Sequence, residues 1–576
     1  MSLSQQRRIQ ISLGITLFAA TAAFVLWQNA HVAVLWDLSY LLDSSYRIAL
    51  GQIPYRDFPF AHAPITFLLQ AAILRLTGRV YFHHVLYAAV AGATATLLTW
   101  HLLQRLLGKI RNSSLIAAFL AITLVPLGIY GIYPHPIYDS DTILFVLLAL
   151  SLLQGTFERP LPSAALNVLA GISLIPPLFC KQNIGLFFLA STVAVLLLLA
   201  AIHRLQRQSL RTEAVILLSA ALALGLSLAA IQLTAGLHPY LYWTFTFAAQ
   251  RRLPGLGLIL GIYHQPSLLW TVPCAFAALF LLQAKIPHRW FNAWTNMWAR
   301  TAAFVLLTAP FLFVIASTLL ADDPSDRADA LLSLWPHLLV LSLCLTIYNL
   351  VLRPITFQGL LPLILLATVH GTFLSQQLWG STYAIWPLLA LLIACFVISL
   401  PEIQELSLPV IVVISAVFFG CGLPYALSHD RLGYIQMEGP LAHSTNPALR
   451  GLSTPGPWIP AFDELISDTA RTIPANDLIL LFPGQDPFYY ASGRVPRFPV
   501  LMFDPATNPY SPRQLAEQVQ QQNVRWLILH RQLQLAGKPM ENYNDYLTEL
   551  RPLFVLDHTL SNYEIYRRRQ SLSGDR

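Results

Sequence analysis

The sequence predicts a polytopic α-helical membrane protein that ends in a small α/β domain on the extracytoplasmic side. Of the 576 residues, 56% are hydrophobic and only 11% are charged, and the mean hydropathy is +0.57. A soluble domain carries roughly twice that share of charged residues. Apolar runs of about 20 residues, which is the length needed to span a bilayer, recur from Ile11 to Leu427. From these runs we expect about 13 transmembrane helices.

The first apolar run, Ile11 to Trp27, is predicted to stay in the protein as an uncleaved helix. The arginines at positions 7 and 8 also fit a signal peptide, but the run is long for a signal core and no small-x-small cleavage site precedes Gln28. Basic connections then recur on every second crossing, near Arg105, Arg207 and Arg353. The positive-inside rule places these connections and the N-terminus in the cytoplasm.

An odd number of spans puts everything after Leu427 outside the membrane. We therefore divide the chain into a transmembrane domain, residues 1–427, and an extracytoplasmic α/β domain, residues 428–576. The stretch from His429 to Pro460 is rich in Pro, Gly, Ser and Asn, which predicts a loop. Beyond it, helical patterns alternate with short strands. The predicted helices are Phe462–Thr472, Pro512–Asn523 and Tyr543–Leu550, and the predicted strands are Asp477–Phe482, Val524–Leu529, Leu553–Asp557 and Tyr563–Arg567.

Several function classes are excluded by the absence of their motifs. The five cysteines all lie in or beside apolar runs, so no disulfide is expected in the exported domain. The sequence has no CxxC or His/Cys cluster of the zinc-binding kind, no P-loop and no GxGxxG after a strand. We predict no cofactor, and a divalent cation between Asp37 and Asp139 is left open. The net charge of +7 is a topology signal, and no nucleic-acid partner is predicted.

The first extracytoplasmic loop, about residues 32–80, holds a predicted amphipathic helix that starts near Asp37. Leu38, Leu41 and Leu42 form an apolar stripe on this helix, with Asp43 and Arg47 on the opposite face, which predicts a helix lying flat at the membrane surface. Asp43 and Arg47 are spaced for an i, i+4 ion pair. Asp37 fits either a first-turn acid favoured by the helix dipole or a functional carboxylate.

The same loop resembles the first extracytoplasmic loop of the GT-C superfamily of polyprenyl-phosphate-sugar glycosyltransferases. It is similar to the bacterial protein-mannosyltransferase and aminoarabinose-transferase group. The matching residues are Trp36 and Asp37, then Gly51, the PYRDF sequence Pro54–Phe58, and His62 before Pro64. This chain departs from the family pattern at Leu38, where members often have Glu, and at Ala63, where some members have Pro.

Three later segments resemble further parts of these enzymes. IYDSDTILFVLLAL (137–150) resembles their second outside loop and the helix after it, and LFCKQNIG (178–185) resembles a turn after their fifth helix. FYYASGRVPRFP (488–499) resembles a stretch of their exported domain, in which we expect Arg494 to organise a turn.

The resemblance implies a glycosyltransferase that moves a sugar from a polyprenyl-phosphate-linked donor to an acceptor hydroxyl at the outer face of a bacterial inner membrane. It implies Asp37 as the general base of an inverting displacement. Asp43, Asp139 and Asp141 are the alternative acids, with a helix-capping role as the alternative for Asp141. The implied partners are the lipid-linked donor, an envelope glycan, lipid or protein acceptor, and the bilayer.

A cation is expected near the phosphate that leaves with the lipid. Lys181 lies within apolar sequence, where an ionised group usually has a ligand or partner, although it could also snorkel to the interface. Arg251 and Arg252 fit either this role or a solvated loop pair. The predicted phosphate-binding residues are Arg56, Lys181, Arg251 and Arg252, and the predicted cavity residues are Tyr55 and His62, with packing as the alternative for His62.

Two other classes stay open at this point. A transporter or flippase would also have about a dozen spans, but it should show charged or Gly/Pro-broken helices at mid-membrane and paired halves. The sequence shows few charges inside the spans and no convincing repeat. A noncatalytic envelope-assembly protein would not need a carboxylate at Asp37, so the variant Asp37→Asn would be silent.

Overall fold

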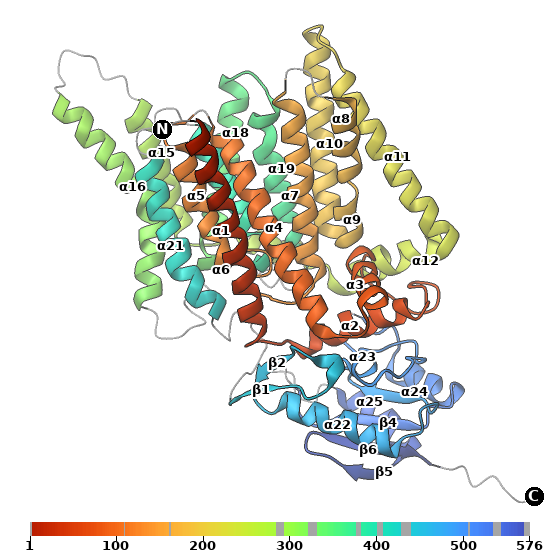
Figure 1. Cartoon of the computed structure of the whole chain (residues 1–576). Coiled ribbons are helices and arrows are strands. Elements are labelled where there is room, and N and C mark those ends of the chain that lie inside the picture. The colour runs from red at the N-terminus through yellow and green to blue at the C-terminus, as the bar shows by residue number, and fades with distance from the viewer. Residues whose placement is uncertain are drawn as a thin grey trace, which may run out of the picture.

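The protein consists of a helical bundle with a small α/β region packed against one of its ends (Figure 1). The computed structural model describes residues 3–108, 110–159, 163–283, 293–320, 331–375, 382–399, 407–427, 439–504, 507–533 and 543–569. The N-terminus lies at the end of the bundle opposite the C-terminal region. The predicted fold class, a polytopic helical membrane protein with a small C-terminal α/β region, is confirmed.

The bundle is built from apolar helices of unequal length. Within the described residues, seven helices are long and apolar enough to cross a membrane, and six further apolar helices are shorter. These seven long helices are α1 (Leu3–Asn29), α4 (Tyr81–Leu107), α7 (Tyr138–Phe157), α10 (Gln182–Leu205), α11 (Arg211–Thr234), α18 (Leu334–Leu352) and α21 (Ser407–Leu427). The six shorter ones are α3 (Ile65–Thr77), α5 (Ser113–Ile122), the consecutive α8 (Ala164–Ser173) and α9 (Pro176–Cys180) counted together, α15 (Leu268–Gln283), α19 (Phe357–Thr372) and α20 (Trp386–Ser399). The described residues also form α6 (Leu124–Leu127), α12 (Leu237–Leu241), α13 (Ala248–Arg252), α14 (Leu256–Gly261) and α16 (Ala293–Leu320).

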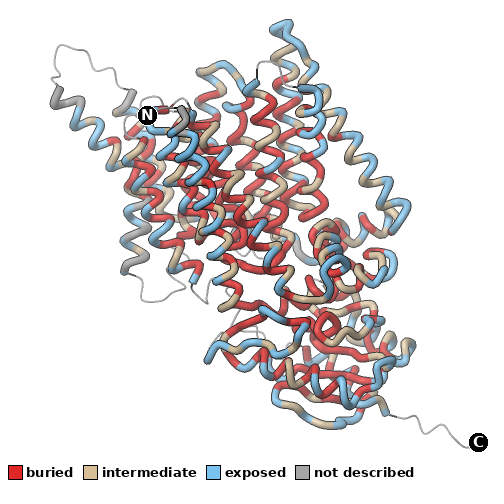
Figure 2. The backbone as a smooth tube through the Cα atoms, in the orientation of Figure 1, coloured by how far each residue is buried: buried red, intermediate tan, exposed pale blue. Residues whose placement is uncertain are grey.

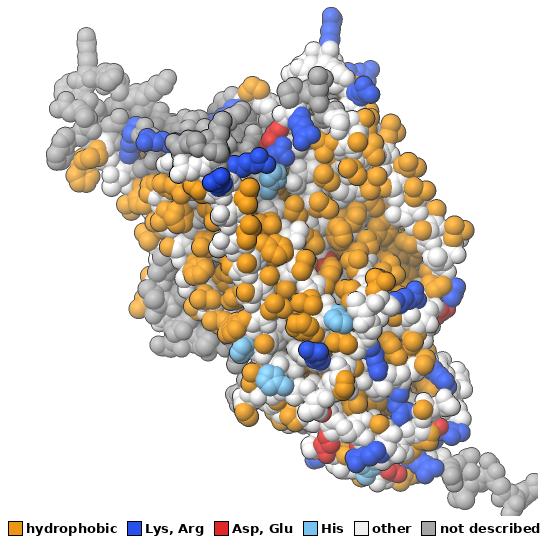
Figure 3. All heavy atoms as spheres, viewed as in Figure 1, with side chains coloured by type: hydrophobic (Ala, Val, Ile, Leu, Met, Phe, Trp, Pro, Cys, Tyr) orange, Lys and Arg blue, Asp and Glu red, His pale blue; other side chains and the backbone are white. Residues whose placement is uncertain are grey.

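The outside of the bundle is apolar, as a lipid-facing surface must be. Figure 3 shows a belt of hydrophobic side chains, with Lys and Arg gathered at the end near the N-terminus and again over the C-terminal region. On α11, which Figure 2 shows as largely exposed, Leu218, Leu222 and Leu226 are 63–69% exposed. Burying such a surface in hydrocarbon removes it from water, so the chain is an integral membrane protein.

The C-terminal region contains a four-stranded sheet in the order β3-β4-β6-β5. β3 and β4 are parallel, and the other two pairings are antiparallel. Its strands are β3 (Ile479–Phe482), β4 (Trp526–His530), β5 (Phe554–Thr559) and β6 (Tyr563–Arg568), and its helices are α22 (Trp458–Thr472), α23 (Phe488–Ser492), α24 (Pro512–Gln521) and α25 (Asn544–Leu550). The four strands and three helices predicted for this region are present, with ends that differ by a few residues.

The prediction of a plain loop between His429 and Pro460 was wrong for its second half. There β1 (Leu441–His443) pairs antiparallel with β2 (Ser453–Pro455), and residues 428–438 lie outside the described part of the chain. Strands of three residues are too short to show the alternating pattern by which a strand is recognised.

The helix α2 (Leu35–Ala49) lies between the bundle and the C-terminal region, and α3 (Ile65–Thr77) follows it. Leu35, Leu38 and Leu42 share a hydrophobic core with residues of the C-terminal region, including Trp458 and Phe462. Leu41 and Ile48 belong instead to the core of the bundle. The predicted helix therefore exists, but one apolar side packs on the C-terminal region rather than on lipid.

The polar side of α2 also contacts the C-terminal region, so the predicted ion pair between Asp43 and Arg47 is wrong. The Asp43 carboxylate accepts the backbone N–H groups of Tyr489 (3.2 Å) and Tyr490 (2.6 Å) at the start of α23. Arg47 donates to the carbonyl of Pro499 (2.8 Å), and its guanidinium lies 4.3 Å from the centre of the Phe58 ring. The i, i+4 rule missed this because the partners lie about 450 residues away in the sequence.

Candidate active site

The loop between α2 and α3 is folded into a tight turn by the PYRDF sequence. Tyr55 has a φ of +70°, in the left-handed region that non-glycine residues rarely adopt. Its backbone N–H donates to the carbonyl of Phe58 (3.0 Å), and its phenol donates to the carbonyl of His62 (2.7 Å). Burial raises the pKa of Tyr55 well above its usual range, so the phenol keeps its proton and remains a donor. This turn fixes the backbone position of His62.

His62 lies in a cavity of about 190 Å³. Residues from α10, from the π-helical turn Tyr242–Phe247 and from the end of α19 complete the lining. Short π-helical segments occur frequently at functional sites. The polar members of the lining are His62, Tyr138, Lys181, Gln182, Asn183, Thr244 and Ser375, and the apolar members include Leu186, Phe187, Leu253 and Leu374.

Lys181 supplies the positive charge of this cavity. It occupies an extended residue between α9 and α10, and its Nζ forms an ion pair with Oδ1 of Asp139 in the first turn of α7. The ammonium also lies 5.3 Å from the centre of the Tyr138 ring. Both side chains are nearly buried, with 10% of Lys181 and 4% of Asp139 exposed. The two predicted residues thus meet, as buried charges usually do in a membrane protein.

The two residues after Lys181 join the surrounding segments. The Gln182 amide donates to the carbonyls of Ala61 (3.3 Å) in the first loop and Thr244 (3.0 Å) in the π-helical turn. The Asn183 amide donates to the carbonyl of Gly371 (2.9 Å) at the end of α19. The cavity walls, which come from distant parts of the sequence, are therefore held together by this one short segment.

A glycine allows α9 and α10 to approach each other closely beside Lys181. A Cβ atom at Gly185 would lie 2.3 Å from the backbone of Leu178, so a larger residue would push the helices apart. The segment LFCKQNIG is accordingly a closely packed turn that places a lysine in the cavity.

Asp37 lies in the first turn of α2 and is partly buried. The hydroxyl of Tyr133 donates to its Oδ2 at 2.9 Å, and Tyr133 in turn stacks on Tyr383 with ring centres 5.4 Å apart. Asp37 is not among the residues that line the 190 Å³ cavity. It lies one helical turn before Tyr40, whose hydroxyl is 2.9 Å from Nδ1 of His62. On α2, Asp37 thus precedes by three residues the tyrosine that is hydrogen-bonded to the cavity residue His62.

Two of the other predicted acids, Asp141 and Asp43, have their hydrogen-bond partners outside the cavity. Asp141 is fully buried and accepts hydrogen bonds from the hydroxyls of Thr66 (2.7 Å), Tyr87 (2.8 Å) and Tyr130 (2.6 Å). Asp43 holds the start of α23, and burial raises its pKa to about 8, against the two backbone N–H bonds, which favour the ionised form. Neither residue lines the cavity.

The predicted arginines are placed elsewhere. Arg56 is 52% exposed at its side chain and forms an ion pair with Asp57 at 2.8 Å. Arg251 donates to the carbonyl of Asn508 (3.2 Å) in the C-terminal region. The side chain of Arg252 lies outside the described part of the structure. Of the predicted cations whose side chains are described, Lys181 lines the cavity and Arg56 and Arg251 do not.

Within the part of the chain that the structure describes, no group of three or more His, Cys, Asp or Glu side chains is arranged to hold a metal ion. Sequence reasoning missed Tyr133, Tyr138 and Tyr40 as neighbours of the site. Tyrosines at the ends of membrane helices are common as interfacial anchors, so their occurrence alone did not distinguish them.

Comparisons with known proteins returned structural likenesses only. No family model matches the sequence, and no curated protein matches it. The structure aligns with ArnT from Cupriavidus metallidurans bound to undecaprenyl phosphate over 98% of this chain and 99% of that one, with 12% identity and a TM-score of 0.46. It aligns with the oligosaccharyltransferase AglB from Archaeoglobus fulgidus, in complex with an inhibitory peptide and a dolichol-phosphate, over 97% and 74%, with 13% identity and a TM-score of 0.44.

Proposed function

We propose that this chain is an integral-membrane glycosyltransferase that moves a sugar from a polyprenyl-phosphate-linked donor to an acceptor hydroxyl. The observation that carries the proposal is the cavity at Lys181. A buried lysine held by Asp139 shares this cavity with His62, and His62 is bonded to Tyr40, one turn from Asp37 on α2. In the proposal, Lys181 is the cation for the phosphate of the donor, and Asp37, on the helix that carries Tyr40, is the carboxylate for the acceptor hydroxyl.

The lipid-phosphate end of the donor fits the cavity by charge and by polarity. An ammonium group carries three N–H donors, and in the proposal a phosphate oxygen of the donor accepts one of those on Lys181. Leu186 lines the cavity and is 44% exposed, so the cavity opens toward the lipid-facing surface of α10. An isoprenoid tail would leave the cavity on this side and stay in hydrocarbon.

The reaction is proposed as a single inverting displacement. Asp37 accepts the proton of the acceptor hydroxyl as its oxygen attacks the anomeric carbon. The bond from that carbon to the phosphate oxygen breaks, and its electron pair leaves with the lipid phosphate, whose charge Lys181 stabilises. General-base assistance of this kind contributes about 10²–10⁴ in rate. Asp139 keeps Lys181 in place.

The proposed location is a bacterial inner membrane with the N-terminus in the cytoplasm and the C-terminal region outside. Two observations support this orientation. The basic connections recur on every second crossing, which the positive-inside rule assigns to the cytoplasm. The N-terminus and the C-terminal region lie at opposite ends of the bundle, and α2 lies at the C-terminal end. The proposed site therefore faces the outer leaflet.

The test is sugar transfer in membranes that contain the wild-type protein or Asp37→Asn, supplied with undecaprenyl-phosphate-linked sugars. We expect the variant to lose about 100-fold or more in rate because it cannot accept the proton. Asp545→Asn, an exposed aspartate on α25, is the matched control and should transfer at the wild-type rate. Both variants should show the wild-type unfolding temperature in detergent.

Each result has a defined meaning. Loss of transfer in Asp37→Asn alone supports the reaction and its base together. Equal transfer in both variants contradicts Asp37 as the base and moves that role to another carboxylate, first Asp139. No transfer from any lipid-linked donor by the wild-type protein overturns the glycosyltransferase and favours a transporter or flippase, or a noncatalytic assembly protein.

A further inference from the structure

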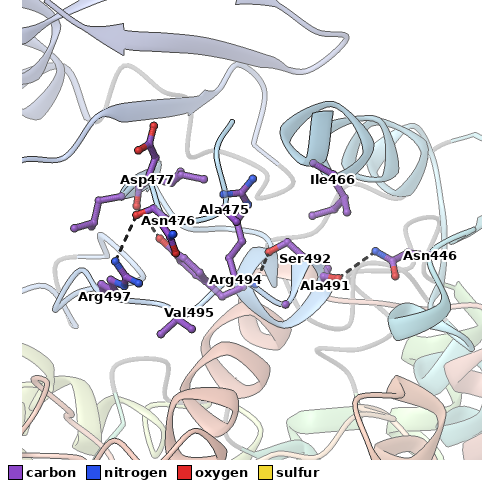
Figure 4. Close-up of a pocket in the computed structure, with 15 residues that line it drawn as sticks. Asn446, Ile466, Ala475, Asn476, Asp477, Ala491, Ser492, Arg494, Val495 and Arg497 are labelled. Atoms are coloured by element: carbon purple, nitrogen blue, oxygen red, sulfur yellow. Dashed lines mark hydrogen bonds between the residues drawn. The ribbon is translucent and has the colours of Figure 1, made fainter. Parts of the chain in front are cut away.

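A larger cavity, of about 600 Å³, lies entirely within the C-terminal region (Figure 4). It is bounded by α22, by α23 and the residues after it, and by the segment that leads into β3. A cavity of this size is typical of sites that hold a small organic ligand. Its polar lining consists of Asn446, Asn476, Asp477, Ser492, Arg494 and Arg497, which Figure 4 shows around the opening.

The charge balance of this cavity is positive. The Arg494 guanidinium donates to the carbonyls of Pro474 (2.8 Å), Thr469 (2.8 Å) and Ile473 (2.6 Å), so it closes the end of α22. As expected, it organises a turn, and these three hydrogen bonds all go to backbone carbonyls. Arg497 is exposed and donates to the carbonyl of Asn476 at 3.4 Å.

The one carboxylate in the lining is already neutralised. Asp477 accepts from Arg525 at 3.1 Å and from Nε1 of Trp526 at 3.0 Å. Among the ion pairs of the described residues, Asp477 pairs with Arg525, and neither Arg494 nor Arg497 pairs with a carboxylate. Two guanidinium groups therefore border the cavity against a single carboxylate, Asp477, which is already paired with Arg525.

The cavity and α2, the helix that carries Asp37, both contact α23. Its wall includes Tyr489 and Ser492 of α23. The start of α23 is held by Asp43 of α2, and the hydroxyl of Tyr46 donates to the carbonyl of Gly493 (3.0 Å) at its end. One short helix thus separates the cavity from α2, and Asp37 lies six residues, or about 9 Å along the helix axis, before Asp43.

We propose that this cavity, the acceptor pocket, binds an anionic saccharide, a sugar that bears a carboxylate or phosphate, as part of the acceptor. Guanidinium groups bind carboxylates and phosphates through paired N–H donors. The side chains of Asn446, Asn476 and Ser492 supply the amide and hydroxyl groups that bind sugar hydroxyls. The assignment as acceptor rests on the proposed glycosyl transfer, whereas the binding of an anionic saccharide does not.

The test is equilibrium binding to the full-length protein in detergent, with trigalacturonate and glucose 6-phosphate as anionic probes and maltotriose as the neutral probe. We expect at least one anionic probe to bind with a Kd of about 1 mM or below and maltotriose to bind at least tenfold more weakly. Arg497→Gln should raise the Kd of the anionic probe about tenfold or more, since it removes a charge-assisted contact. Asn476→Asp, which adds a negative charge beside the same opening, should raise it as well.

The matched control is Arg513→Gln, which removes an exposed arginine of α24 that pairs with Glu517 outside the pocket. It should leave binding unchanged. Equal binding of maltotriose and the anionic probes would overturn the proposal. A Kd for the anionic probes that is the same in both pocket variants as in the wild type would overturn it too. So would the failure of both anionic probes to bind at about 10 mM.

The two proposals fail separately. Anionic binding that depends on Arg497, in a protein that transfers no sugar, keeps the pocket and overturns the glycosyltransferase. Sugar transfer by a protein that binds neither anionic probe keeps the enzyme and overturns the pocket.

Discussion

The two halves of α2 can be compared directly, because each carries one aspartate. In the second half, Asp43 is buried and both of its oxygens accept backbone N–H groups of α23. In the first half, Asp37 is partly buried and accepts the hydroxyl of Tyr133, a side-chain donor that an incoming hydroxyl resembles chemically. The comparison teaches that two aspartates six residues apart on one helix can have different partners: Asp43 docks a distant region through backbone N–H groups, whereas Asp37, the proposed base, meets a side-chain hydroxyl.

The largest effect is expected from a change at Lys181, because this residue both pairs with Asp139 and has a proposed role in the reaction. In Lys181→Met, Asp139 becomes a buried charge without its ion-pair partner, which costs about 3–5 kcal/mol of stability. The double variant Lys181→Met with Asp139→Asn should recover most of that stability but not the transfer of sugar. Thermal unfolding and transfer are measured for both variants. Recovered transfer in the double variant would contradict a role for Lys181 in the reaction.

The docking half of α2 is tested by Asp43→Ala. The backbone N–H groups of Tyr489 and Tyr490 would lose their acceptor in a buried place, at about 1–3 kcal/mol each. We expect a lower unfolding temperature and faster proteolysis of the C-terminal region. Asp545→Ala, at an exposed position, serves as the control. An unchanged unfolding temperature for Asp43→Ala would show that α2 is held in place by its apolar contacts alone.

The half of α2 that carries the proposed base is tested by two tyrosine variants. Tyr133→Phe removes the hydroxyl that donates to Asp37, and we expect transfer to fall about tenfold, the value of one hydrogen bond to a charged group, with little change in stability. Tyr130→Phe removes one of the three hydroxyls on the buried Asp141. It should lower stability by about 1 kcal/mol and leave the transfer rate per folded protein unchanged. The reverse pattern would exchange the roles given to these two aspartates.

The smallest expected effect is a pH dependence of stability that arises from His558 in the C-terminal region. Burial lowers the pKa of His558, but its hydrogen bonds to Asp557 and Asp468 outweigh this and raise the pKa above its usual value. The stability from this histidine is complete below its unfolded pKa of about 6.5 and is lost as the pH rises through the folded value. Unfolding temperatures from pH 6 to 8 should fall slightly in the wild type and less in His558→Gln. With the side chain 30% exposed, the change should stay below about 1 kcal/mol.

Much of the C-terminal region could be predicted from local pattern. The runs DLILLF and VRWLIL are short, apolar and bounded by turn residues, and they became the neighbouring parallel strands β3 and β4. The helix α2 was recognised in the same way, from its leucines. A local pattern identifies an element, but it does not name the surface on which the element packs.

The contacts between residues far apart in the sequence could not be predicted as well. Asp139 and Lys181 are 42 residues apart, and both were candidates, yet nothing in one sequence joined them. The Asp43 contact to Tyr490 spans 447 residues, and there a nearby arginine four positions away offered a plausible but wrong partner. Arg56 was predicted to bind the donor phosphate, but it forms an ion pair at the surface with its neighbour Asp57.

The hydrophobic core shared by α2 and the C-terminal region has a consequence for how the protein is made. Leu35, Leu38 and Leu42 enter the membrane region early in synthesis, but the residues that cover them, Trp458 and Phe462, emerge more than 400 residues later. A nascent chain therefore carries α2 without the surface on which it packs, and Asp37 reaches its final position only after the last span has been inserted and the C-terminal region has folded. Premature termination anywhere before this region would leave α2 in a membrane-inserted chain that lacks the surface on which α2 packs.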